Sequence, residues 1–165
     1  MRRLIVGAAV LAVSAALVVS PPASTLASWL DREQSTGGFT ALKVLAPTFT
    51  SCVLTTGLLG ADPVVTVTWT MPAGYTVANV KVGTYNSVTS AWTDVTASPQ
   101  VVRTGTSPHF TTKFSSGLLT GLLGGSITLG MMTTHSSGWT SGWQSATASA
   151  ALLGINPQCT INPAP

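Results

Sequence analysis

Residues 65–82 read VTVTWTMPAGYTVANVKV and hold the clearest alternation in this chain of 165 residues. From Val65 to Met71 apolar side chains alternate with threonines, which is the pattern of a strand with one buried and one solvated face. Turn-forming residues follow at 72–74, and a second alternation begins at Val80. The stretch therefore predicts two strands that each turn one face toward a core.

Shorter runs of the same kind lie on both sides of this stretch. Together they predict about seven strands, at residues 49–53, 65–71, 80–86, 91–96, 109–114, 127–131 and 146–152. Strands with one apolar face are buried when two sheets stack, so we expect an all-β two-sheet sandwich. The expected core comprises Val65, Val67, Trp69, Val80, Val82, Phe110, Phe114, Ile127 and Leu129.

The quoted stretch resembles the second and third strands of a fibronectin type III-like or immunoglobulin-like domain, with Trp69 as the core tryptophan that ends the second strand. Residues 126–149, SITLGMMTTHSSGWTSGWQSATAS, resemble the final hairpin of the same fold. The usual tyrosine of the penultimate strand is replaced by Ile127 or Leu129. The resemblance covers about residues 47–153 and implies an immunoglobulin-like sandwich.

The N-terminus predicts export from the cytoplasm. Two arginines precede an apolar run of about 16 residues, and two prolines and small residues follow it. This is the order of a secretory signal peptide, with cleavage expected between Ala27 and Ser28. A retained membrane anchor is the alternative, but the run is shorter than the roughly 20 residues that span a bilayer. We expect a helical signal peptide at 1–27, a leader at 28–46 and a β-sandwich domain with a C-terminal tail at 47–165.

The leader carries a second resemblance. Residues 27–41 read ASWLDREQSTGGFTA, similar to the start of camelysin/TasA-type secreted proteins of Gram-positive bacteria, which carry SipW-dependent signal peptides. Leu30 replaces a hydroxyl residue of that pattern, and Leu42 replaces a glycine. The resemblance implies a matrix or fibre component, and a secreted peptidase as a weaker alternative. The segment 39–45 also suits a short strand.

Charged residues are scarce, and the excess of basic residues belongs to the signal peptide. Without residues 1–27 the chain has five Lys or Arg against four Asp or Glu, a net charge of +1. No basic cluster remains to act as the electrostatic footprint of a nucleic-acid binder. We therefore expect neither a nucleic acid nor, after signal cleavage, a membrane as partner.

The chain contains two cysteines, Cys52 and Cys159. In an exported protein such a pair is expected to form a disulfide, which here ties the first strand to the C-terminal tail. Two buried thiols are the alternative. Neither histidine has a suitable partner nearby in sequence, so we expect no metal site.

The sequence offers little catalytic chemistry. It has no HExxH phrase, no GxSxG elbow and no phosphate-binding glycine loop followed by lysine. His109 and His135, with Asp62 or Asp94, could complete a serine triad, but a serine-rich chain offers such sets by chance. We interpret His135 as a solvated loop residue and His109 as an outward strand residue. We expect no catalytic residue, no cofactor and no enzymatic activity.

Two further features point toward surfaces. Trp139 and Trp143 lie four residues apart in the expected last hairpin, where strand geometry would place them on one face. They either cover the end of the core or form a binding surface for a sugar or a protein.

Glycine-flanked leucine pairs recur at residues 57–60, 117–119 and 121–124. They either plug the open ends of the sandwich or form an exposed apolar patch for assembly or adhesion.

The function expected from these features is that of a secreted structural or adhesive protein of the bacterial surface or extracellular matrix. Its expected partner is a second copy or another surface protein, with the leader adding as a strand to a neighbour's sheet edge. The alternative is a carbohydrate-binding module that uses Trp139 and Trp143 on a polysaccharide.

Overall fold

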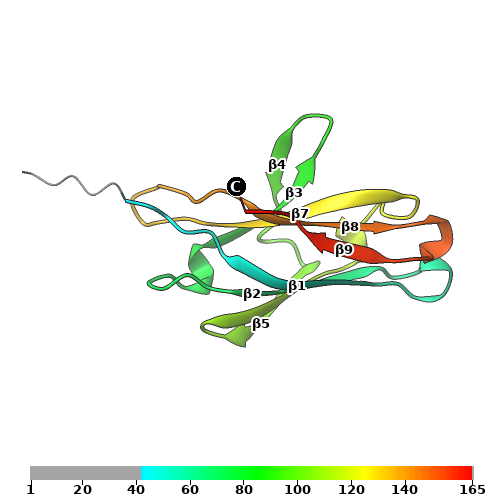
Figure 1. Ribbon diagram of the computed structural model, residues 1–165, viewed down its shortest axis with the longest axis horizontal. Coiled ribbons are helices and arrows are strands. Elements are labelled where there is room, and N and C mark those ends of the chain that lie inside the picture. Colours follow the sequence, from blue (N-terminus) through cyan, green and yellow to red (C-terminus); the bar gives the residue numbers. More distant parts are fainter. Residues whose placement is uncertain (1–41, 165) are drawn as a thin grey trace, which may run out of the picture. The chain divides into compact units, whose positions relative to one another are not determined.

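The computed structural model describes residues 42–164, which form a sandwich of two antiparallel sheets around one core (Figure 1). Sheet A has the strand order β1-β2-β6-β5, and sheet B has the order β4-β3-β7-β8-β9. The strands of sheet A are β1 (Thr48–Thr55), β2 (Val64–Thr70), β6 (His109–Phe114) and β5 (Val101–Thr106). Those of sheet B are β4 (Ala91–Asp94), β3 (Val80–Asn86), β7 (Gly125–Thr133), β8 (Gln144–Ala150) and β9 (Gln158–Ile161). Short 3-10 turns lie between them, η1 (Leu58–Gly60), η2 (Val77–Asn79), η3 (Ser116–Leu118) and η4 (Leu152–Gly154).

This architecture confirms the predicted all-β two-sheet sandwich and is compatible with an immunoglobulin-like or fibronectin type III-like fold. The described residues form nine strands, where the sequence predicted about seven. The two additional strands, β5 and β9, both lie at sheet edges. Because β9 follows the β7–β8 hairpin, that hairpin is not the last element of the fold.

The core lies where the inward faces of the two sheets meet. Of the predicted core residues, Val65, Val67, Trp69, Val80, Val82, Phe114 and Leu129 are buried, while Phe110 and Ile127 are half-buried and pack against them. The Trp69 indole N–H donates a hydrogen bond of 2.9 Å to Thr112 Oγ1, and the ring stacks on Phe110 with centroids 4.9 Å apart. Thr112, which the sequence did not single out, thus gives the buried indole its acceptor.

A disulfide joins Cys52 on β1 to Cys159 on β9, with the Cα atoms 5.4 Å apart and a sequence separation of 107. The two strands are edge strands of different sheets, so the bond fastens sheet A to sheet B along one side of the sandwich. The predicted pairing is confirmed, and the alternative of two free thiols is wrong.

Several N-terminal predictions fall outside the described residues. These are the helical signal peptide at 1–27, the cleavage site between Ala27 and Ser28, and the leader as far as residue 41. Residues 42–47 are described, and they form an irregular segment leading into β1 instead of the strand expected at the end of 39–45. Within 42–164, no helix is both long enough and apolar enough to cross a membrane.

Candidate functional site

Two loops at one end of the sandwich share a sequence and a backbone shape (Figure 1). The loop between β1 and β2 reads GLLGADP at 57–63, and the loop between β8 and β9 reads ALLGINP at 151–157. In each loop the amide of the first residue donates to the carbonyl of the fifth, at 2.6 Å to Ala61 and at 3.0 Å to Ile155. The loops are therefore structural equivalents, one from each sheet.

Both loops hold a leucine in a left-handed backbone conformation. The φ angle is +56° at Leu59 and +66° at Leu153, and the glycine that follows each is also at positive φ. The left-handed conformation is less favourable by roughly 1–2 kcal/mol for a residue that has a Cβ atom. Asp and Asn adopt this conformation more readily than other such residues. Asp62 and Asn156 accordingly occupy the other positive-φ position of each loop. The same backbone shape is thus built twice despite this conformational cost.

The two loops pack against each other through glycine. A Cβ on Gly154 would lie 2.5 Å from the Cα of Gly60, and a Cβ on Gly60 would lie 2.7 Å from Leu123 Cδ2. The Thr56 hydroxyl also donates to the carbonyl of Gly154 at 3.1 Å. A third loop, which leads into β7, joins them because the amide of Gly124 donates to the carbonyl of Ala150 at 2.9 Å. Three segments far apart in sequence are thereby fixed at one end of the molecule.

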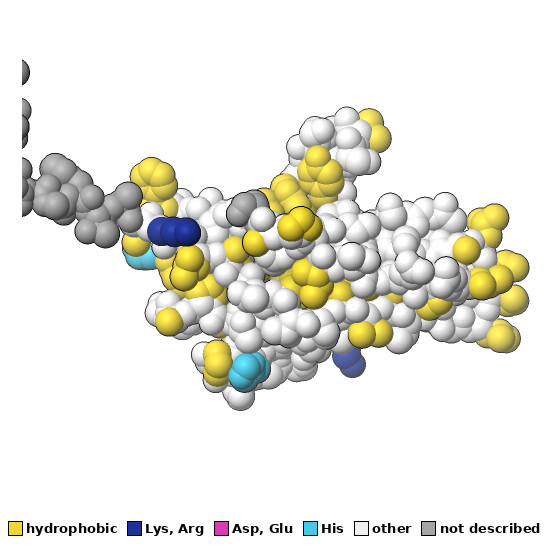
Figure 2. Space-filling view, in the orientation of Figure 1, with side chains coloured by type: hydrophobic (Ala, Val, Ile, Leu, Met, Phe, Trp, Pro, Cys, Tyr) yellow, Lys and Arg dark blue, Asp and Glu magenta, His cyan; other side chains and the backbone are white. Residues whose placement is uncertain are grey.

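This end carries a cluster of exposed apolar side chains, which we name the leucine tip. Its exposed fractions are 87% at Leu58, 69% at Leu59, 41% at Leu123, 72% at Leu152, 58% at Leu153 and 63% at Ile155. Figure 2 shows hydrophobic side chains gathered at this end, with no charged side chain among them in that view. Fully burying one leucine is favourable by about 1.5–3 kcal/mol. The tip is therefore an apolar surface able to associate with another one.

The two interpretations of the leucine pairs, as plugs of the core and as an exposed patch, each apply to some of these leucines. Leu119 and Leu122 are buried and fill the end of the core, whereas Leu58 and Leu59 are exposed. The pair at 152–153 was not among the leucine pairs predicted from the sequence, although it supplies two of the tip's four most exposed leucines. The signal was present as a repeated Leu-Leu-Gly-x-Asp/Asn-Pro phrase, with an alanine in place of the first glycine.

A second cluster, which we name the tryptophan clasp, lies on the outer face of sheet B. Trp92 on β4 and Trp143 just before β8 stack with ring centroids 4.4 Å apart and planes within 10°. Tyr85, the cross-strand partner of Trp92, adds a third ring at 5.3 Å. Stacked aromatic pairs contribute about 0.5–1.5 kcal/mol beyond the area that they bury.

Two glycines form the floor of the tryptophan clasp. Gly83 on β3 and Gly130 on β7 are direct cross-strand partners. A Cβ on Gly130 would lie 2.5 Å from Trp92 Cη2, and a Cβ on Gly83 would lie 2.7 Å from Trp143 Cη2. Trp92 therefore reaches across β3 to β7, and Trp143 reaches across β7 to β3. The two indoles cross over one another and hold four strands of sheet B together.

We expect Gly130→Ala to destabilise the fold by about 1–3 kcal/mol, because the added methyl group displaces the Trp92 ring. Urea unfolding measures the stability, and near-UV circular dichroism follows the stacked indoles. In a Trp92→Ala background the same substitution should cost much less, because the close approach to the Trp92 ring is gone and the 3.2 Å approach of the new methyl group to the Gln144 carbonyl remains. Equal losses in both backgrounds would disprove the packing role of the glycine.

The clasp changes the interpretation of the predicted binding surface. Trp143 is half-buried and stacks on Trp92, while Trp139 is 67% exposed in the β7–β8 loop. The chain between them is outside β8, so the strand geometry that would have aligned the two rings does not apply. Trp139 is the more accessible of the two tryptophans.

The two histidines considered for catalysis differ in their surroundings. His135 Nδ1 lies 2.7 Å from Ser137 Oγ within one turn, and its ring meets Tyr75 edge-on. His109 is exposed at the start of β6. Within residues 42–164 no three His, Cys, Asp or Glu side chains gather in a way that could hold a metal ion.

The charged groups with shifted pKa values lie away from the leucine tip. Hydrogen bonds from the side chain and amide of Thr96 hold the pKa of Asp94 below its ordinary value, and Lys81 at 3.8 Å acts in the same direction. Burial lowers the pKa of Arg103, whose guanidinium donates to the carbonyl of Val77 at 3.1 Å. Both groups support the fold of the neighbouring strands.

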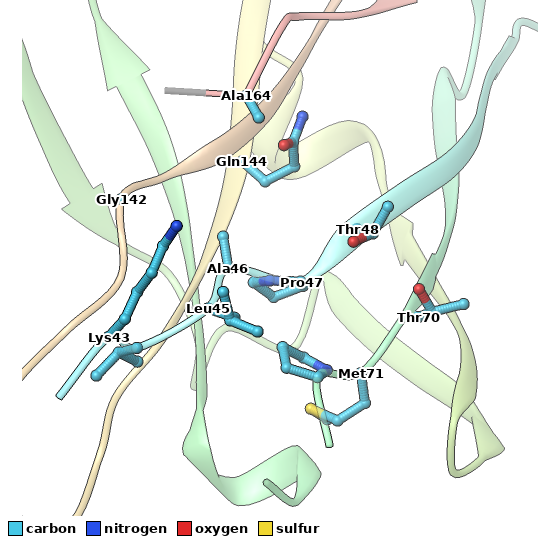
Figure 3. A pocket seen from close by; sticks show the side chains of 12 residues that line it. Lys43, Leu45, Ala46, Pro47, Thr48, Thr70, Met71, Gly142, Gln144 and Ala164 are labelled. Atoms are coloured by element: carbon cyan, nitrogen blue, oxygen red, sulfur yellow. The ribbon is translucent and has the colours of Figure 1, made fainter. Parts of the chain in front are cut away.

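A groove of about 380 Å³ lies where the segment 43–48 passes residues 70–72 (Figure 3). Gly142, Gln144 and Ala164 complete its lining, and Lys43 is the one ionisable side chain among the lining residues. The Gln144 amide donates to the carbonyl of Asn162 at 2.9 Å, so it holds the C-terminal segment in place. The groove has no acid–base pair, and its residues mainly pack the entering chain onto the sandwich.

Comparison of the chain with protein-family models, with curated proteins and with solved structures gives no match. The function proposed below is therefore inferred chiefly from the geometry of the leucine tip.

Proposed function

We propose that this chain is a secreted, non-enzymatic protein of the bacterial surface or extracellular matrix, with a structural or adhesive role. The observation that carries the proposal is the leucine tip, in which three loops are fixed so that apolar side chains face outward. Exposed apolar patches of this kind mark interaction sites in soluble proteins. Contact through the tip is therefore the proposed mode of action.

Four other features support the proposal. The disulfide between Cys52 and Cys159 suits an oxidising compartment outside the cytoplasm. The N-terminal pattern is that of a signal peptide, and the resemblance of residues 27–41 to SipW-dependent leaders of Gram-positive bacteria agrees with a matrix component. A fibronectin type III-like sandwich is a common architecture of cell-surface domains.

Strand addition and carbohydrate binding are two alternative modes of action that stay predictions. Assembly by strand addition would use the leader, with β4 or β5 as the receiving edge, because the edges of β1 and β9 are joined by the disulfide. Carbohydrate binding would depend chiefly on Trp139, which is exposed, because Trp143 is engaged with Trp92. Both can be separated from tip-mediated contact by substitution.

The test uses protein recovered from the culture medium of the source bacterium, with its N-terminus read by mass spectrometry. We expect the chain to begin at Ser28 and the labelled protein to bind intact cells or their matrix. Leu58→Ser with Leu152→Ser, one change in each equivalent loop, should reduce the bound fraction at least tenfold, since two leucines lose their apolar contact.

The matched control is Val88→Ser, because Val88 is 92% exposed in the β3–β4 turn, away from the tip. This variant should bind like the unchanged protein. Binding lost through Trp139→Ala and retained in the double leucine variant would favour a carbohydrate module instead. Turnover of casein by the purified protein would favour the peptidase alternative.

A further inference from the structure

We infer that the leucine tip inserts into the acyl-chain layer of a lipid membrane, so that its partner is a lipid surface. This inference rests on the proposed contact role of the tip and names the partner of that contact. It revises the sequence-based expectation that the mature chain has no membrane partner, which depended on charge alone.

The small size of the tip argues against a protein partner. It offers six apolar side chains from three loops, whereas a stable protein interface uses about 20–30 residues on each side. A second copy meeting tip to tip would bury too little surface to remain bound. Acyl chains are a deformable apolar phase, so they surround protruding side chains without a complementary surface.

Several polar backbone groups of the tip are paired within the two equivalent loops. In both equivalent loops the glycine amide donates to a carbonyl within the loop, at 3.1 Å from Gly60 to Gly57 and at 3.1 Å from Gly154 to Ala151. The amides of Gly57 and Ala151 are also bonded across their loops. Polar backbone groups that are paired internally enter a bilayer at much lower cost than unpaired ones.

The charge of the tip predicts which lipids it binds. Asp62 is the one charged residue in the segments 57–63, 121–124 and 151–157. Attraction of membrane-bound proteins to anionic lipids comes from lysine and arginine near the surface. The tip has neither, so its binding should need no anionic lipid and should be insensitive to salt.

The test is co-flotation of the mature, disulfide-bonded chain with phosphatidylcholine vesicles. We expect reversible binding with a partition coefficient on the order of 10⁴ M⁻¹, comparable to that of one acyl anchor. Added phosphatidylglycerol should not strengthen it. Leu58→Ser with Leu152→Ser should weaken binding at least tenfold, and Val88→Ser should leave it unchanged. Near-UV circular dichroism of the leucine variant verifies that it is folded.

Insertion is tested separately with a tryptophan probe. Fluorescence of Leu58→Trp should be quenched by vesicles brominated in the acyl chains, relative to the unchanged protein, and Val88→Trp should show no added quenching. Equal flotation of the leucine variant and the Val88 control, or no flotation at all, would overturn the lipid proposal. If tip-dependent binding to cells persisted in that case, the adhesive function would stand with a protein partner.

Discussion

Replacing both Cys52 and Cys159 by serine is expected to lower the free energy of unfolding by roughly 4–5 kcal/mol, because the lost crosslink spans 107 residues. The unfolded chain gains conformational freedom when so long a loop is opened. A loss of this size is comparable to a large part of the stability of an ordinary domain. Urea unfolding of the variant and of the unchanged protein, followed by tryptophan fluorescence, measures the difference.

The unchanged protein treated with a reducing agent is the control, and it should lose the same stability as the serine variant. Agreement between the two shows that the loss comes from the crosslink and not from the serine side chains. A midpoint within error of the oxidised protein would show that packing alone holds β1 beside β9.

Trp69→Ala is expected to destabilise the sandwich by about 3–5 kcal/mol through the lost side chain and its cavity. The substitution also leaves the hydroxyl of Thr112 buried without its donor. A buried polar group without a partner costs roughly a further 1–3 kcal/mol. Denaturant unfolding measures the total, and the variant should be largely unfolded if the domain has ordinary stability.

The two contributions are separated by further variants. Trp69→Phe keeps most of the ring volume but removes the indole N–H, so it should cost less than Trp69→Ala. Combining Trp69→Phe with Thr112→Val removes both hydrogen-bond partners and should recover part of that loss. If the double variant is less stable than the sum of its parts, the hydrogen bond is not what Thr112 contributes.

The sequence predicted the central strands because their pattern follows from burial on one face. Residues 65–71 alternate without a break, and β2 covers nearly the same range. The core position of Trp69 follows directly from that alternation. The pairing of two cysteines, in a chain whose N-terminus predicts export, likewise needed no knowledge of the fold.

The edge strands could not be predicted because they lack that pattern. β5 begins with two valines in a row and continues with Arg103, and it pairs on one side only. β9 is four residues long and lies between two prolines. β5 and β9 are strands because they pair with β6 and β8. The residues of β5 and β9 alone therefore do not indicate that they form strands.

The sequence left the candidate sites undecided between alternatives for a related reason. Leu118, Leu119 and Leu122 occur in phrases that look like those of Leu58 and Leu59, yet most of the first group are covered by the core. Whether a leucine in a loop is buried depends on the chain segments above it. The stacking of Trp143 on Trp92 depends in the same way on two glycines of neighbouring strands.

The position of the disulfide has a mechanical consequence. If the chain is pulled from its two ends, the tension enters through the segment before Cys52 and leaves through the segment after Cys159. The load passes across the sulfur bridge, and residues 53–158 carry none of it. A chain crosslinked this way does not lengthen through residues 53–158 while the bridge is intact, and it would extend by about the length of that segment once the bridge is reduced.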